Sequence, residues 1–174
     1  MIYASLLASL LALIIYMLVV IKKLGIPASI SESYYRIEHR KWFTFVMLII
    51  AFCIIPVSYE ASTPASRFLM FLAAAGLIII AVAPNFAYGE KSEFIAHYTG
   101  AAMLLLFSQI WVYINFKYIL LLWILFAGYI VYGLFRNKEA VFYESLKSLK
   151  PIFWAEVTPV SYTHLRAHET RSNL

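Results

Sequence analysis

The sequence contains no aspartate, one cysteine (Cys53) and few charged residues, which make up 13% of its 174 residues. The lack of aspartate excludes aspartyl-protease dyads and every other site that needs an Asp carboxylate. A single cysteine excludes an internal disulfide framework and a cysteine-based metal site. Soluble domains are about a quarter charged, so this chain has too few charges to cover a water-exposed surface.

Apolar residues, in contrast, make up 63% of the chain, against about half in soluble domains. They gather in long runs, several of which approach the roughly 20 residues needed to cross a hydrocarbon core. The sequence therefore predicts an all-α fold, an integral membrane helical bundle with the lipid bilayer as its surroundings. We expect five spans, at residues 2–21, 43–57, 68–83, 94–114 and 118–135.

The C-terminal part departs from this pattern. Residues 137–149 alternate apolar and charged side chains, which predicts an interfacial helix, and 151–157 resembles the opening of a sixth span. Residues 160–170 (VSYTHLRAHET) resemble the translation of a transposon sequencing adapter. Processing segments are excluded from fold reasoning. We therefore expect a native domain at 1–158, a truncated sixth span and a non-native tail at 159–174, and we set aside the apparent i,i+4 metal pair of His164 and His168.

The basic residues predict an orientation, because Lys and Arg concentrate in cytoplasmic loops. Ten of them lie in the first loop, in the third loop and after the fifth span, whereas the other side has only Arg67 and Lys117. We expect the N-terminus outside and the first and third loops in the cytoplasm. Since this distribution accounts for the positive charge, we predict no nucleic acid partner.

One face of the fourth predicted span carries an acid, an imidazole, two small residues, a leucine, a hydroxyl and an indole: Glu93, His97, Gly100, Ala101, Leu104, Ser108 and Trp111. At 100° per residue these positions lie within roughly 60° of His97. Ionisable groups in spans are costly and usually face the bundle interior. The candidate ligand-binding residues are therefore His97, Glu93, Ser108, Trp111 and, in the preceding loop, Asn85. We predict no catalytic residue, no metal and no cofactor.

Two interpretations of His97 remain open. In the functional one it accepts a proton or contacts a ligand or lipid headgroup, is oriented by Glu93, and is joined by His39 and Glu38 from the first loop. In the structural one it hydrogen-bonds a backbone carbonyl or Asn85. The spacing of His39 and His97 is not a metal-binding motif, so metal binding is the weakest alternative.

The segment that runs from Ala83-Pro84 through a short polar loop to His97-Tyr98-Thr99-Gly100-Ala101 resembles small six-span membrane protein families of unknown function from bacteria and their phages. These are distantly similar to DRAM/Sfk-type membrane proteins. The resemblance implies a six-span helical bundle and a bacterial inner membrane as its location. It implies no activity.

Together these observations favour a non-enzymatic membrane protein that binds a lipid or small hydrophobic ligand, or that serves as a membrane partner subunit. A small transporter or channel-like protein that uses His97 is the first alternative, and a membrane lipid-modifying enzyme is the second. A polar cavity lined by three or more spans would favour the transporter. A cluster of His97 with His39 and Glu38 would favour the enzyme.

Overall fold

The structure is a computed structural model that describes residues 2–116, 121–136 and 148–156. Within these ranges the fold is all-α and contains no strand, which confirms the predicted class. The predicted interfacial helix at 137–149 lies almost entirely outside the described residues, and so do the tail at 159–174 and any continuation of the predicted sixth span beyond 156.

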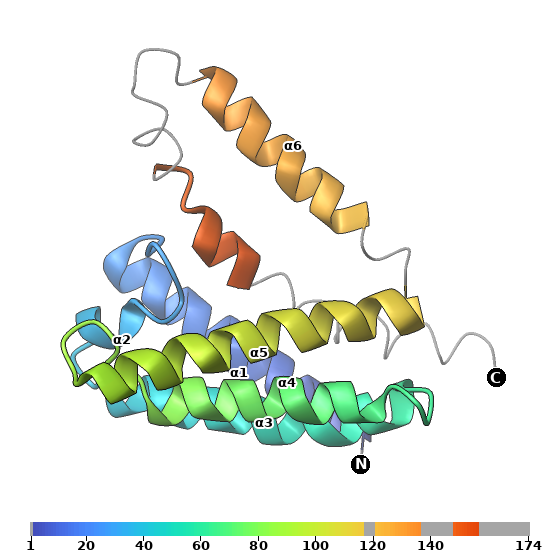
Figure 1. The fold of residues 1–174 in the computed structure, drawn as a ribbon. Coiled ribbons are helices and arrows are strands. Elements are labelled where there is room, and N and C mark those ends of the chain that lie inside the picture. The colour runs from blue at the N-terminus through green and yellow to red at the C-terminus, as the bar shows by residue number, and fades with distance from the viewer. Residues whose placement is uncertain (1, 117–120, 137–147, 157–174) are drawn as a thin grey trace.

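Each predicted span coincides with one helix, and a short helix lies in the first loop (Figure 1). The labelled helices are α1 (Ile2–Leu24), α2 (Ser33–Arg36), α3 (Lys41–Ala61), α4 (Arg67–Val82), α5 (Lys91–Phe116) and α6 (Leu121–Arg136). Residues 151–156 are also helical. The helix α3 continues past its predicted end at 57, through Pro56. Proline has no backbone N–H to donate. In the same turn, the Ser58 hydroxyl donates to the Ile54 carbonyl at 2.7 Å.

By length and composition, α1, α3 and α5 are long and apolar enough to cross a membrane, which makes three such helices in the described part of the chain rather than the predicted five. Both α4 and α6 are apolar but have 16 residues each. At 1.5 Å per residue a helix of this size is about 24 Å long, and a hydrocarbon core is about 30 Å thick. The prediction counted these two apolar runs as spans although each is shorter than the roughly 20 residues that a full crossing needs.

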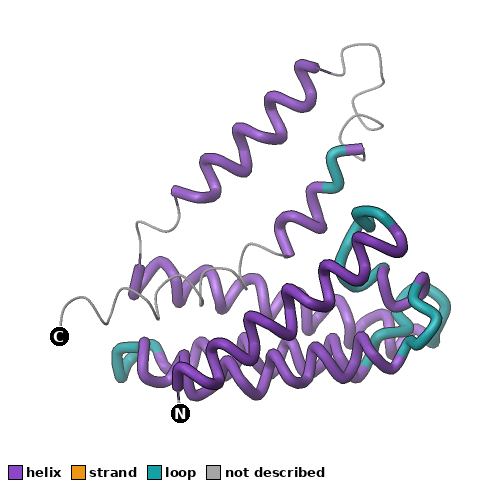
Figure 2. Tube along the Cα trace, turned by 180° about the vertical axis from the view of Figure 1, so that it is seen from behind, coloured by secondary structure: helices purple, strands orange, loops and turns teal. Residues whose placement is uncertain are grey.

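The main contacts between the long helices follow chain order: α3 packs between α1 and α4, and α4 packs between α3 and α5. These four helices form one antiparallel row, and α6 stands apart from it (Figures 1 and 2). The indole N–H of Trp123 in α6 donates to Gln109 Oε1 of α5 at 2.8 Å. Small residues lie at the α4–α5 contact: Gly76 of α4 faces Gly100 of α5, and Ala73 is buried in one cluster with Trp111, as expected for helices that approach closely in lipid.

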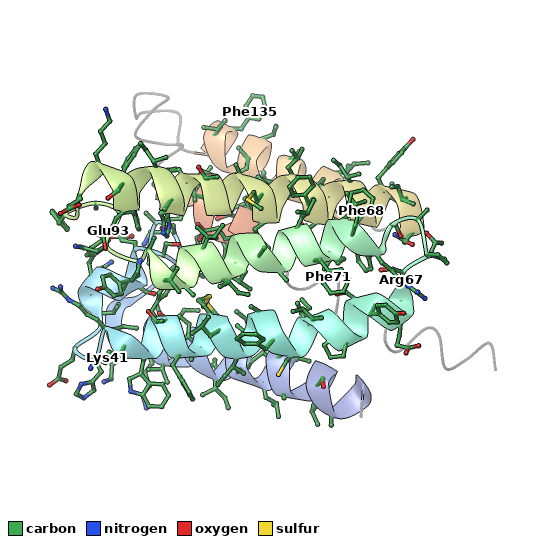
Figure 3. The ribbon with its side chains drawn as sticks, turned by 60° about the horizontal axis from the view of Figure 1, so that its bottom comes forward. Lys41, Arg67, Phe68, Phe71, Glu93 and Phe135 are labelled. Carbon is green, nitrogen blue, oxygen red and sulfur yellow. The ribbon has the colours of Figure 1, made fainter. Side chains whose placement is uncertain are left out.

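The two ends of the row carry different loops (Figure 3). Lys41 and Glu93 lie at one end and Arg67 lies at the other. The first and third loops meet at the first of these ends, where the Ala87 N–H donates to Tyr35 Oη at 2.6 Å. The first and third loops therefore lie together at this end of the row.

The outer surface of the row and of α6 is apolar. Leu18, Phe52 and Leu125 are 62%, 61% and 69% exposed, respectively. Isolated exposed apolar side chains are normal on soluble proteins, but large contiguous patches mark contact with a partner or a membrane. The apolar exteriors of these helices fit membrane association.

Candidate functional site

The predicted site residues are spread along α5 instead of meeting at one point. The 18 positions from Glu93 to Trp111 span about 27 Å at 1.5 Å per residue. They fall into two groups, one at each end of the row. Each group makes contacts with a neighbouring loop or helix.

At the first end, His97 is 4% exposed and is held by two contacts. Its Nδ1 lies 2.8 Å from the carbonyl oxygen of Ala83, and its ring stacks on Phe86 with centroids 4.1 Å apart. A carbonyl only accepts, so Nδ1 carries the proton. Ala83 is the C-cap of α4, at a helix end whose carbonyls lack intrahelical donors. The imidazole thus closes the end of α4, which is the geometry of the structural interpretation.

Asn85 and Glu93 belong to the third loop and its exit into α5. The Asn85 carbonyl accepts the N–H of Gly89 at 2.7 Å. A Cβ placed on Gly89 would collide with the Glu93 carboxylate and with the Asn85 carbonyl. The Glu93 side chain therefore packs over a tight glycine turn. These contacts shape the loop between α4 and α5.

At the opposite end, Trp111 is buried, and its indole N–H donates to Ser62 Oγ at 2.6 Å. The nearby Asn115 side chain accepts the Thr63 N–H at 3.2 Å and donates to the Trp111 carbonyl at 2.9 Å. Ser108 donates to the carbonyl of Leu105 within its own helix at 3.1 Å. Trp111 and Asn115 thus join α5 to the turn between α3 and α4.

The histidines do not cluster. His97 is buried, whereas His39 and Glu38 are exposed on the first loop. Among the residues that the structure describes, no three His, Cys, Asp or Glu side chains are placed to hold a metal ion. The geometry expected for the enzyme alternative is therefore not present in this part of the chain.

A cavity of about 420 Å³ lies on one face of the row, between the long helices and residues 151–156. Its walls are mainly apolar and come from α1, α3, α4 and α5; they include Leu13, Met47, Ile50, Leu77, Ile80 and Leu105. This volume falls within the roughly 300–1,000 Å³ of small-molecule sites. Of the predicted stripe, Ala101 and Leu104 line the cavity. The candidate ligand-binding residues His97, Glu93, Ser108, Trp111 and Asn85 are not among the residues that line it.

The polar atoms of the cavity wall gather where the first loop meets residues 151–156. Glu156 Oε2 accepts the Ile30 N–H at 2.5 Å, and the Ser31 N–H also hydrogen-bonds this carboxyl. Phe153 is 1% exposed, and its N–H donates to the Ala28 carbonyl at 3.0 Å.

Sequence reasoning assigned no role to Glu156. The available signal was a lone carboxylate in the otherwise apolar run 151–157. A separation of 126 positions between Ile30 and Glu156 hides their contact from any local pattern. The cavity itself depends on that contact, because residues 151–156 form one of its walls.

Comparisons with models of known protein families, with curated proteins and with solved structures found no match for this chain. The resemblance to six-span membrane families is therefore a proposal only. The cavity and its single carboxylate are the strongest indication of function that the molecule offers.

Proposed function

We propose that this chain is a multi-pass membrane protein whose bundle binds the hydrocarbon part of a lipid or of a similar hydrophobic ligand. The observation that carries this proposal is the apolar cavity of about 420 Å³ among α1, α3, α4 and α5. Apolar pockets with a few convergent polar groups are the usual form of small-molecule sites. The site is thus the cavity, and His97 supports the fold beside it.

The membrane part of the proposal has five spans, with α4 and α6 crossing as short helices. A short apolar helix is accommodated by local thinning of the bilayer or by flanking residues, at modest cost. Exposed aromatic side chains lie near the helix ends, among them Trp42, Tyr59 and Tyr113, and such rings favour the membrane–water boundary. The basic first and third loops would face the cytoplasm, and a bacterial inner membrane is the proposed location.

The depth of the cavity suits a ligand that enters from the bilayer. Its polar wall, at Ser31 and Glu156, lies at the end of the row that carries the first loop. Its lining on α5 runs from Tyr98 to Leu105, seven positions, which corresponds to about 10 Å. The apolar part of a ligand would lie against this stretch.

The transporter and enzyme alternatives both use His97. Its buried Nδ1–H is committed to the Ala83 carbonyl, and the residue does not line the cavity. The cavity wall is also apolar, whereas a pathway for a polar solute needs side chains that replace the hydrogen bonds between the solute and water. The geometry therefore supports hydrophobic ligand binding more than either alternative.

The test is lipid retention by the protein purified in a neutral maltoside detergent and measured by native mass spectrometry. Ala102 lines the cavity and is exposed, so Ala102→Trp can fill the cavity without disrupting a packed core. We expect this variant to lose most of the bound lipid mass. Ala127 is exposed on α6 and lies outside the cavity wall, so Ala127→Trp is the matched control and should retain it. Equal retention by the two variants would contradict the proposal.

A further inference from the structure

We infer that the cavity selects single-chain amphiphiles with a protonated amine headgroup, and that the Glu156 carboxylate is the headgroup acceptor. This inference rests on the proposed function, since it names the ligand class of the same cavity. Three features of the site carry it: the placement of its polar groups, the unused acceptor capacity of Glu156, and the sign of its charge.

The polar groups occupy one end of the cavity. Ser31 and Glu156 are hydrogen-bonding residues at that end, beside the backbone of the first loop, and Tyr98 of α5 adds a phenol to the wall. The remaining wall is built from apolar side chains, mainly of the four long helices, such as Met47, Ile80 and Leu105. A ligand that matches this wall has one polar head and one apolar chain.

Glu156 has acceptor capacity left for a ligand. A carboxylate offers about four lone-pair sites, and two backbone N–H groups, of Ile30 and Ser31, use part of this capacity. Neither donor carries a formal charge. An incoming headgroup that donates hydrogen bonds can therefore bind without displacing the contacts that hold residues 151–156 on the first loop.

The negative charge of the Glu156 carboxylate determines that the preferred headgroup is positively charged. In the described part of the chain the ion pair present is Arg36 with Glu32 at 3.7 Å, and no Lys or Arg pairs with Glu156. A partly buried carboxylate without a cationic partner is costly, and a bound ammonium group would offset that cost. In its ionised form the same carboxylate would repel a fatty-acid headgroup.

Chain-matched probes test this inference on the purified protein in neutral maltoside detergent. Hexadecylamine, hexadecanol and palmitate share one alkyl chain and differ in the headgroup. We expect hexadecylamine to bind roughly tenfold more tightly than the other two, as a charge-assisted hydrogen bond provides. Glu156→Gln, which keeps an oxygen for the Ile30 N–H, should abolish the preference while still binding all three. Glu90→Gln, an exposed carboxylate at the same end, should keep it.

The outcomes separate the two proposals. If none of the three probes binds, the proposed function and this inference both fail. If all three bind with equal affinity, or if palmitate binds most tightly, the inference is overturned while the proposed function stands. This comparison uses the unaltered chain, so it decides the question even if Glu156→Gln does not fold.

Discussion

Gly76 of α4 and Gly100 of α5 face each other where the two helices cross. A Cβ added to Gly76 would lie 2.6 Å from the Gly100 carbonyl oxygen, and a Cβ added to Gly100 would lie 2.7 Å from the Gly76 carbonyl oxygen. Small residues at such crossings let helix backbones approach closely in lipid. At this distance the two helices exclude even a methyl group between them.

Gly76→Ala should therefore force α4 and α5 apart. We expect the free energy of unfolding to fall by about 1–3 kcal/mol, the usual cost of overpacking, when unfolding is followed in detergent by circular dichroism. Gly128 in α6 is the control, because a Cβ there meets nothing within 4 Å. Equal effects of Gly76→Ala and Gly128→Ala would show that the crossing is not tightly packed.

His97→Ala should destabilise the protein without removing its ligand. The variant loses the hydrogen bond to the Ala83 carbonyl and the stack on Phe86, and we expect a loss of about 1–3 kcal/mol because that buried carbonyl stays unpaired. His39→Ala, at an exposed position, should change stability by less than about 0.5 kcal/mol. Lipid retention by the folded His97→Ala variant, measured by native mass spectrometry, should match the unaltered chain. Loss of lipid retention by this variant would show that His97 belongs to the binding site.

Asn115→Ala should loosen the opposite end of the row. The side chain joins the Thr63 N–H to the Trp111 carbonyl, so its removal leaves both groups without that partner and should cost about 1–3 kcal/mol. Limited proteolysis in detergent should cut the turn at 62–66 faster in this variant. Glu60→Gln, an exposed change near the same turn, is the control and should leave the cleavage rate unchanged.

Residues 88 and 65 should be accessible from opposite sides of the membrane. Tyr88 is 82% exposed on the third loop, and Ala65 is exposed in the turn before α4. In a Cys53→Ser background, a membrane-impermeant maleimide added to intact cells should label Ala65→Cys and leave Tyr88→Cys unlabelled until the cells are opened. The reverse labelling pattern would show that the orientation is opposite to the proposed one. Labelling of both cysteines in intact cells would show that α4 does not cross the membrane.

The helices and the sharing of one end by the first and third loops were predictable from the sequence, because apolar runs and their alternation are local features. The face of each helix that points into the protein was not predictable from the sequence. Leu13 is 6% exposed and Leu18 is 62% exposed in the same helix, yet both are leucines. Lipid is as apolar as a protein core, so hydropathy does not separate the two environments.

The candidate site was predicted less well than the fold. The stripe on α5 correctly identified buried polar residues, namely His97 and Ser108. Their partners, however, are backbone carbonyls at Ala83 and Leu105, and composition and spacing cannot distinguish such a partner from a ligand. Glu156 escaped notice for the opposite reason, since its contacts come from a loop near the other end of the chain.

The contact between His97 and the Ala83 carbonyl also bears on how the chain is made. With the glycine crossing, it ties α4 to α5 along half of their shared length, so the 16-residue α4 need not be stable in lipid by itself. If the chain spans the membrane as proposed, the two helices are suited to enter it together as a helical hairpin. In that case α4 would commit to the bilayer only after α5 has emerged from the ribosome.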